Sequence, residues 1–231
     1  MAKLFDIRIL IPAYNEATVI GAVIAGLQGA GFAHILVIDD GSTDNTATAA
    51  KAMGAQVIRH ATNRGAGAAI QTGLMTAKRK KWPLVALMDA DGQHHAEDIV
   101  VMKDAMDASG YDLVIGSRFL HLENEIPGSR IFFNRVGNMM TNLMCKNKYT
   151  DSQSGLRLLN QYAIEKLELH IDGFGYCSEM IHQAEKRGLT IGEAPTRVLY
   201  SKYSLNKGQD FEVGITTAIS FIWKILFGKQ H

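Results

Sequence analysis

A short apolar run near the middle of the chain leads directly into two carboxylates. Residues 84–88 have the length and composition of a buried strand, and Asp89, Asp91 and Gln93 follow it. Because side chains alternate along extended chain, Asp89 and Asp91 face the same side. Carboxylates this close repel each other unless a cation lies between them, and Mg²⁺ or Mn²⁺, usually with bound phosphate, prefers such oxygen ligands. Asp and Gly are also common turn residues, so the motif alone leaves a metal site and an acidic turn open.

Short apolar runs alternate with helical patterns throughout the first half of the chain. Strands are predicted at residues 7–11, 34–39, 56–59, 84–88 and 112–115, with helices at 17–30, 44–53, 68–81 and 96–108. Runs this apolar indicate an α/β fold with a mostly parallel sheet covered by helices on both faces. Ligands bind at the carboxyl ends of the strands in such sheets. The polar residues at these ends are Tyr14, Asn15 and Glu16, then Asp39 and Asp40, then Asp89 and Asp91, and finally Arg118. Their expected convergence favours a binding site over a plain turn.

Beyond residue 119 the alternation gives way to a different pattern. Helices are predicted at residues 130–144, 161–167 and 178–187, with a polar loop at 151–157 and a strand at 191–199 that Pro195 assigns to a sheet edge. A basic segment at 200–208 precedes an apolar helix at 213–227. This helix is too short to span a membrane. Three positions are open for this helix: at a membrane interface, packed on the domain, or in a homodimer contact. Residues 130–144 are a second interfacial candidate.

Whole-chain totals exclude several classes of protein. The formal net charge is +1, so no overall positive field favours nucleic acid. The two cysteines, Cys145 and Cys177, argue against a disulfide framework and fit a reducing compartment. No signal-peptide core and no window of 18 or more apolar residues is present, so we expect a cytoplasmic protein without a membrane span.

Four motifs follow one another in a recognisable order. They are Ile11-Pro12-Ala13-Tyr14-Asn15-Glu16, Asp39-Asp40-Gly41-Ser42-Thr43-Asp44, Asn63-Arg64-Gly65-Ala66-Gly67 and Asp89-Ala90-Asp91. In this order and spacing the chain resembles family 2 glycosyltransferases of GT-A fold, within them the polyprenyl-phosphate branch similar to dolichol-phosphate-mannose synthase. The resemblance covers roughly residues 7–207. It implies a UDP- or GDP-linked sugar donor, a divalent metal and inversion at the anomeric carbon. It also implies one GT-A domain, with residues 1–120 as the donor half and 121–231 as the acceptor half.

The resemblance also implies roles for individual residues. The nucleotide sugar would lie on Pro12, Tyr14, Glu16, Asp40, Asn63, Gly65, Gly67, Asp89, Ala90, Asp91, Gln93, Lys202 and Lys207, and Mg²⁺ or Mn²⁺ on Asp89, Asp91 and Gln93. Tyr14 offers a ring for the base, and Gly65 and Gly67 leave out the Cβ so that backbone can approach the donor. Asp91 and Arg118 are the expected catalytic residues. Arg118 suits this role because a guanidinium can bind phosphate with two hydrogen bonds.

Several further residues are weaker candidates. At most one of His94 and His95 faces the site, because neighbours diverge in extended chain, and both are interpreted as loop residues. Lys202 or Lys207, with Arg197 as a further candidate, could close over the diphosphate. The Gly-x-Ser-Lys stretch usual in dolichol-phosphate-mannose synthases is absent, so neither mannose nor GDP is implied. Secondary candidates for the acceptor phosphate are Arg130, Arg135 and Arg157.

The acceptor decides whether the reaction needs a base. A sugar hydroxyl must lose a proton, whereas a polyprenyl phosphate is already anionic. Asp151 and Glu179 are the candidate bases, and neither is clearly placed. We therefore expect an inverting hexosyltransferase acting on dolichyl or undecaprenyl phosphate. It would be peripheral at the cytoplasmic membrane face through residues 213–227, as a homodimer or with a separate membrane subunit. The alternatives are transfer to a sugar hydroxyl in polysaccharide or glycoprotein glycan synthesis and a non-catalytic nucleotide-sugar-binding module. The module is less favoured because Asp89 and Asp91 are both present.

Overall fold

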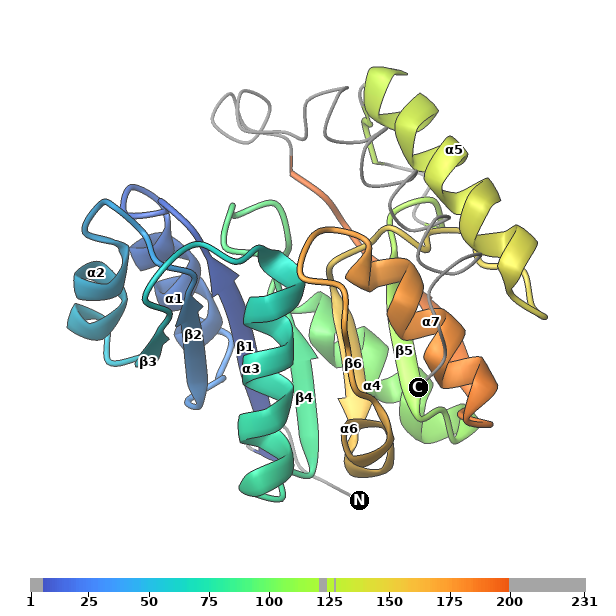
Figure 1. Ribbon diagram of the computed structural model, residues 1–231, viewed down its shortest axis with the longest axis horizontal. Coiled ribbons are helices and arrows are strands. Elements are labelled where there is room, and N and C mark those ends of the chain that lie inside the picture. Colours follow the sequence, from blue (N-terminus) through green and yellow to red (C-terminus); the bar gives the residue numbers. More distant parts are fainter. Residues whose placement is uncertain (1–5, 121–123, 127, 200–231) are drawn as a thin grey trace.

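One mixed sheet forms the centre of the molecule. The computed structural model describes residues 6–120, 124–126 and 128–199 (Figure 1). Its strands are β1 (Ile7–Ala13), β2 (Ile35–Asp39), β3 (Gln56–Arg59), β4 (Leu84–Leu87), β5 (Leu113–Ser117), β6 (Arg157–Asn160) and β7 (Ile191–Pro195). They lie in the order β3-β2-β1-β4-β6-β5-β7. Only β6 is antiparallel to its neighbours, β4 and β5, among the described strands.

Helices cover both faces of this sheet. They are α1 (Ile20–Gly29), α2 (Thr46–Ala52), α3 (Ala66–Arg79), α4 (Asp98–Ser109), α5 (Gly128–Met144), α6 (Gln161–Lys166) and α7 (Tyr176–Lys186). Along β1, Ile9 and Ile11 pack into a core shared with α1, α2 and α4, while Leu10 between them belongs to the core under α3, α6 and α7. This alternation is what a strand buried on both faces requires. The expected α/β architecture is confirmed.

Helix α5 lies outside these two layers, beyond the carboxyl edge of the sheet, and packs on α7 (Figure 1). The Thr141 and Ser178 hydroxyls join the two helices by a buried hydrogen bond of 2.7 Å. The opposite side of α5 carries exposed large apolar residues, namely Phe132, Val136, Met139 and Leu143. Their spacing of four, three and four residues places them on one stripe of the helix.

The strand β6 differs from what its sequence predicts. Residues 151–156 form the expected loop, but Arg157–Asn160, for which no strand is predicted, form one between β4 and β5. The run is four residues long and begins with arginine, so it lacks the apolar length that marks the other central strands. The predicted edge strand is β7, which ends at Pro195 and pairs with β5 alone.

Two expectations fall outside the described residues. These are the closing lysines Lys202 and Lys207 and the apolar helix at 213–227, which remain predictions. The division into a donor half and an acceptor half at residue 120 also remains a prediction. None of the helices in the described ranges is both long and apolar enough to cross a membrane.

Candidate active site

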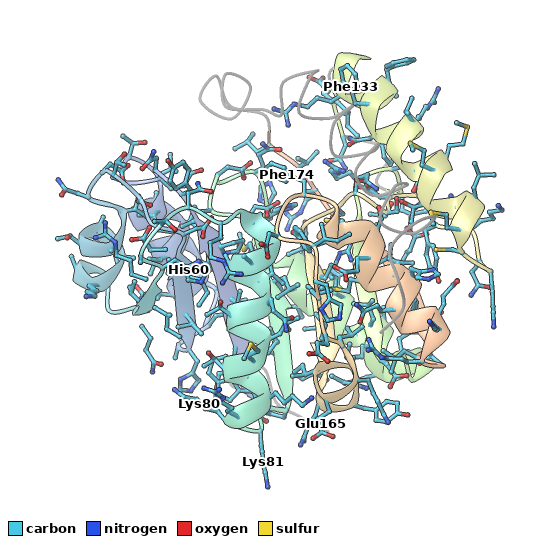
Figure 2. The ribbon with its side chains drawn as sticks, viewed as in Figure 1. His60, Lys80, Lys81, Phe133, Glu165 and Phe174 are labelled. Atoms are coloured by element: carbon cyan, nitrogen blue, oxygen red, sulfur yellow. The ribbon has the colours of Figure 1, made fainter. Side chains whose placement is uncertain are left out.

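A cavity of about 470 Å³ opens at the carboxyl ends of β1, β2 and β4, bounded by the first turns of α3 and α7 and by α5. Most of the site residues predicted from the sequence line this cavity, namely Pro12, Tyr14, Glu16, Asp40, Asn63, Gly65, Asp89, Ala90, Asp91, Gln93 and Arg118. Phe174, half exposed, lines the cavity from the loop that leads into α7 (Figure 2). The predicted residues among them come from five separate segments of the chain and share one space.

The acidic pair lies in the loop after β4. Asp91 accepts hydrogen bonds from the backbone N–H and the side-chain amide of Gln93, at 3.0 and 2.6 Å. Asp89 has its Oδ2 3.5 Å from Nε2 of His94, whose side chain is only 5% exposed. Of the two adjacent histidines, His94 thus lines the cavity beside Asp89 and His95 does not, as the expectation that at most one of them faces the site requires.

The two carboxylates differ in acidity. Burial, together with the neighbouring charge of Asp89, raises the pKa of Asp91. Burial also acts to raise the pKa of Asp89, but the hydrogen bond and charge of His94, with the charges of Arg118 and Arg157, outweigh it and lower the pKa. Repulsion between the pair is thus present in the folded protein, and a cation between them would relieve it.

The acidic pair fits a cation that arrives with its substrate. Within the described residues, no three His, Cys, Asp or Glu side chains gather into a metal cage. Mg²⁺ in particular is usually held by one or two carboxylates together with substrate phosphates. Asp89, Asp91 and the amide of Gln93 supply that type of incomplete oxygen set, on the cavity wall.

Gly155, just before β6, supports the acidic pair from behind. A Cβ added there would lie 2.2 Å from Oδ2 of Asp89, so only glycine leaves that carboxylate in its place. From the sequence, this glycine is only one residue of the polar loop predicted at 151–157. The contact joins residues 66 positions apart, and no local pattern announces it.

Asp40 anchors the opposite end of the cavity. It is 3% exposed, and its two oxygens accept hydrogen bonds from His60 Nδ1 at 2.6 Å and from the backbone N–H groups of Arg64 and Gly65 at 3.1 and 2.6 Å. Its neighbour Asp39 points away. Asp39 Oδ1 accepts a hydrogen bond from the backbone N–H of Ser42, and Oδ2 forms an ion pair with Arg59 Nε at 3.2 Å. Asp40 therefore holds the 63–65 loop as well as lining the cavity.

The two predicted loop glycines meet protein rather than open space. A Cβ on Gly65, where φ is +107°, would lie 2.4 Å from the carbonyl oxygen of Asp172, and one on Gly67 would lie 1.9 Å from that of Ile171. Gly65 also lines the cavity, whereas Gly67 is not part of the lining. The demand for glycine at these positions thus comes from the segment Ile171–Gly173, which sequence reasoning did not connect with them.

Arg118 enters the cavity from the end of β5. Its Nε and one terminal nitrogen donate to the two oxygens of Asp151 at 2.7 and 2.8 Å, and Asp151 is 1% exposed. Glu179, the other candidate base, accepts the backbone N–H groups of His170 and Ile171 at 2.9 Å. Both carboxylates are structural acceptors, so neither serves as the expected base.

The secondary arginines have different fates. Arg157 is fully buried and donates to the carbonyls of Ser152, Ser154 and Cys177, so it cannot meet an acceptor phosphate. Arg197 pairs with Asp98 at 2.8 Å, away from the cavity lining. Two candidates remain on α5: Arg130 lines the cavity, and Arg135 is exposed outside it.

Comparison with known proteins identifies the family. The family model described as Glycosyl transferase family 2 matches residues 8–168. The UDP-N-acetylglucosamine–dolichyl-phosphate N-acetylglucosaminyltransferase of Methanococcus voltae is 32% identical, over 90% of this chain and 91% of its own. The polyprenol monophosphomannose synthase of Mycolicibacterium smegmatis is 30% identical, over 81% of this chain and 75% of its own.

A solved structure shows the same fold. Glucosyl-3-phosphoglycerate synthase from Mycobacterium tuberculosis, in complex with Mn²⁺ and UDP-glucose, superimposes with a TM-score of 0.71 at 18% identity. The match covers 95% of this chain and 77% of that one, and at such identity it establishes the GT-A fold alone. The matched family model and the relatives together establish that this chain belongs to glycosyl transferase family 2.

Proposed function

We propose that this protein transfers a sugar from a nucleotide-diphosphate sugar to a polyprenyl phosphate, with inversion at the anomeric carbon. The observation that carries the proposal is the chemistry of the acceptor side. There the described cavity lining offers Arg118, Arg130 and Asn134, whose buried side-chain nitrogen has no hydrogen-bond partner in the described part of the chain. Two cations and an open amide donor suit a phosphate.

The positions of the carboxylates support the same acceptor. Among the described residues, the carboxylates that line the cavity are Glu16, Asp40, Asp89 and Asp91, all after β1, β2 and β4. None of the four follows β5 or lies on α5, where the acceptor would enter. A sugar hydroxyl would need a positioned base, and an anionic phosphate needs none.

The reaction would proceed by direct displacement. An oxygen of the acceptor phosphate attacks the anomeric carbon, the bond from that carbon to the diphosphate breaks, and no proton has to move. A divalent cation held by Asp89, Asp91 and Gln93 would supply positive charge to the departing diphosphate. Arg118, whose guanidinium is fixed by Asp151, would stabilise the charge that develops on the phosphate.

Helix α5 supports a position at the membrane surface. Residues 128–148 contain no Asp or Glu and carry Arg130, Arg135, Lys146 and Lys148. With the exposed apolar stripe of Phe132, Val136, Met139 and Leu143, this composition suits an anionic bilayer surface, and Arg130 joins it to the cavity. We propose peripheral binding at the cytoplasmic membrane face through this helix, with residues 213–227 as a second contact.

A donor panel tests the function. Radiolabelled UDP-N-acetylglucosamine, UDP-glucose and GDP-mannose are each supplied with Mn²⁺ or Mg²⁺ and vesicles containing undecaprenyl or dolichyl phosphate. We expect a UDP-linked sugar to label the lipid and to release UDP. Asp91→Asn should abolish labelling, and Asp104→Asn, on the exposed side of α4, should not. Absence of lipid label with every donor, or equal label with polyprenol in place of its phosphate, would overturn the proposal.

A further inference from the structure

We infer that His60 is the positioning residue of the nucleoside subsite: its imidazole fixes Asp40, and through Asp40 the 63–65 loop, in the arrangement that receives the nucleotide. The inference rests on the proposed function for the identity of the ligand. His60 follows β3 and lies between that strand and α3 (Figure 2). It is not part of the cavity lining, whereas Asp40 and Asn63 are.

Both nitrogens of the imidazole are engaged. Nδ1 lies 2.6 Å from Oδ1 of Asp40, and Nε2 lies 2.9 Å from Oγ1 of Thr72 on α3. The side chains of His60 and Asp40 are only 10% and 4% exposed. Because an ionised carboxylate only accepts, Nδ1 must carry the proton in this bond. The ring therefore ties Asp40 to α3 and has no freedom to leave it.

The fixed carboxylate organises the loop in turn. A carboxylate offers about four acceptor positions. At Asp40 these receive His60, the N–H of Gly65 at 2.6 Å, and the N–H of Arg64, shared between both oxygens at 3.1 Å. Asp40 also lines the cavity, where its carboxylate suits a ring N–H of the kind that uracil and guanine carry. Without His60 the carboxylate could rotate, and both the loop and this acceptor would lose their direction.

Substitutions at His60 can separate positioning from simple packing. The amide nitrogen of asparagine is bonded to Cγ, as Nδ1 is, so His60→Asn keeps a donor toward Asp40. Glutamine places its amide near the position of Nε2, so His60→Gln keeps contact with Thr72 and loses Asp40. Loss of a hydrogen bond to a charged group weakens binding by about 10- to 100-fold. We expect His60→Gln and His60→Ala to raise the donor KM by that factor with little change in kcat, and His60→Asn to stay within about threefold of the wild type.

Helix α3 offers a matched control pair. The hydroxyl oxygens of Thr72 and Thr76 both lie within hydrogen-bond distance of the carbonyl oxygen four residues earlier, at 3.0 and 2.9 Å. Of the two hydroxyls, only that of Thr72 also lies beside His60. Thr72→Val should therefore weaken nucleotide binding several-fold, and Thr76→Val should leave it unchanged. Should His60→Ala fail to fold, these two variants and the Asn/Gln pair still decide the matter.

Nucleotide binding is read directly by calorimetry with UDP and GDP in the presence of Mn²⁺, alongside donor KM, kcat and thermal unfolding. Equal effects of Asn and Gln on binding, or an effect confined to thermal stability, would overturn the inference. Because UDP and GDP binding does not require turnover, it tests His60 even where the wild type transfers no sugar. Conversely, wild-type transfer with unaltered nucleotide binding in His60→Gln leaves the proposed function standing and removes the role of His60.

Discussion

The contact between Gly155 and Asp89 allows the proposed metal binding to be perturbed without changing a single polar group. Gly155→Ala would place a methyl carbon 2.2 Å from Oδ2 of Asp89. Ordinary contacts begin near 3.4 Å, so the carboxylate would have to retreat by about 1.2 Å, where metal–oxygen distances tolerate roughly 0.2 Å. The φ angle of Gly155 lies outside the left-handed region, so the perturbation is confined to this contact.

The expected result is a folded protein with a damaged site. The carboxylate of Asp89 is at the end of a flexible side chain and can rotate into the cavity. The free energy of unfolding should therefore fall by only about 1 kcal/mol. Turnover should fall about 100-fold or more, because a displacement near 1 Å of a reacting group has that effect. Mn²⁺ affinity in the presence of UDP should fall with it.

The assay combines electron paramagnetic resonance of bound Mn²⁺, the transfer reaction and thermal unfolding. Gly26→Ala is the control, because an added Cβ in α1 meets no atom within 4 Å. Wild-type Mn²⁺ affinity and turnover in folded Gly155→Ala would refute the placement of Asp89 at the metal.

Three further perturbations test the framework around the site. Gly67→Ala should lower the free energy of unfolding by about 2 kcal/mol, since its Cβ would lie 1.9 Å from the carbonyl oxygen of Ile171; a neutral result in denaturant titration would contradict the packing. Arg157→Met removes the guanidinium donors of three buried carbonyls and should lower the free energy of unfolding by roughly 3–5 kcal/mol, seen as a melting temperature lower by about 10 °C; an unchanged melting temperature would show that the buried charge is dispensable. Burial acts to raise the pKa of Glu185, but hydrogen bonds from the loop after α5 and from Tyr149 outweigh burial and lower this pKa. The stabilisation that ionised Glu185 contributes is therefore present above its unfolded-state pKa and lost as pH falls through its folded-state pKa. Glu185→Gln should therefore lower the melting temperature at pH 7 and have little effect near pH 3; the same difference at both pH values would exclude the charge as its source.

Much of the sheet and of the donor side follows from local pattern. Strands such as β1, β2 and β4 are buried on both faces, so their sequences are apolar throughout, and the polar residues that follow them mark the edge where ligands bind. Asp89 and Asp91 are therefore predictable neighbours of Tyr14, and all three line the cavity.

The rest depends on contacts between distant segments. Arg157 is a candidate phosphate ligand from the sequence because arginine side chains usually lie at the surface or bind anions. In the structure it instead donates hydrogen bonds to backbone carbonyls in the core. The demand for glycine at Gly67 comes from a segment about 100 residues later. His60 had no motif at all, since its partners lie 20 and 12 residues away on other elements.

The reversed direction of β6 also bears on how acceptor choice could be changed. The chain leaves the sheet after β5 and returns through β6 at the same edge, because the two strands are antiparallel. The hydroxyls of Ser117 and Thr150, 2.7 Å apart, and the ion pair of Arg118 with Asp151 fasten the two ends of this excursion together. Because its two ends are joined by these contacts, the segment between β5 and β6 can be exchanged as a unit. Chimeras that exchange residues 119–149 between relatives would alter the proposed acceptor surface, while the sheet register and the proposed donor residues stay in place.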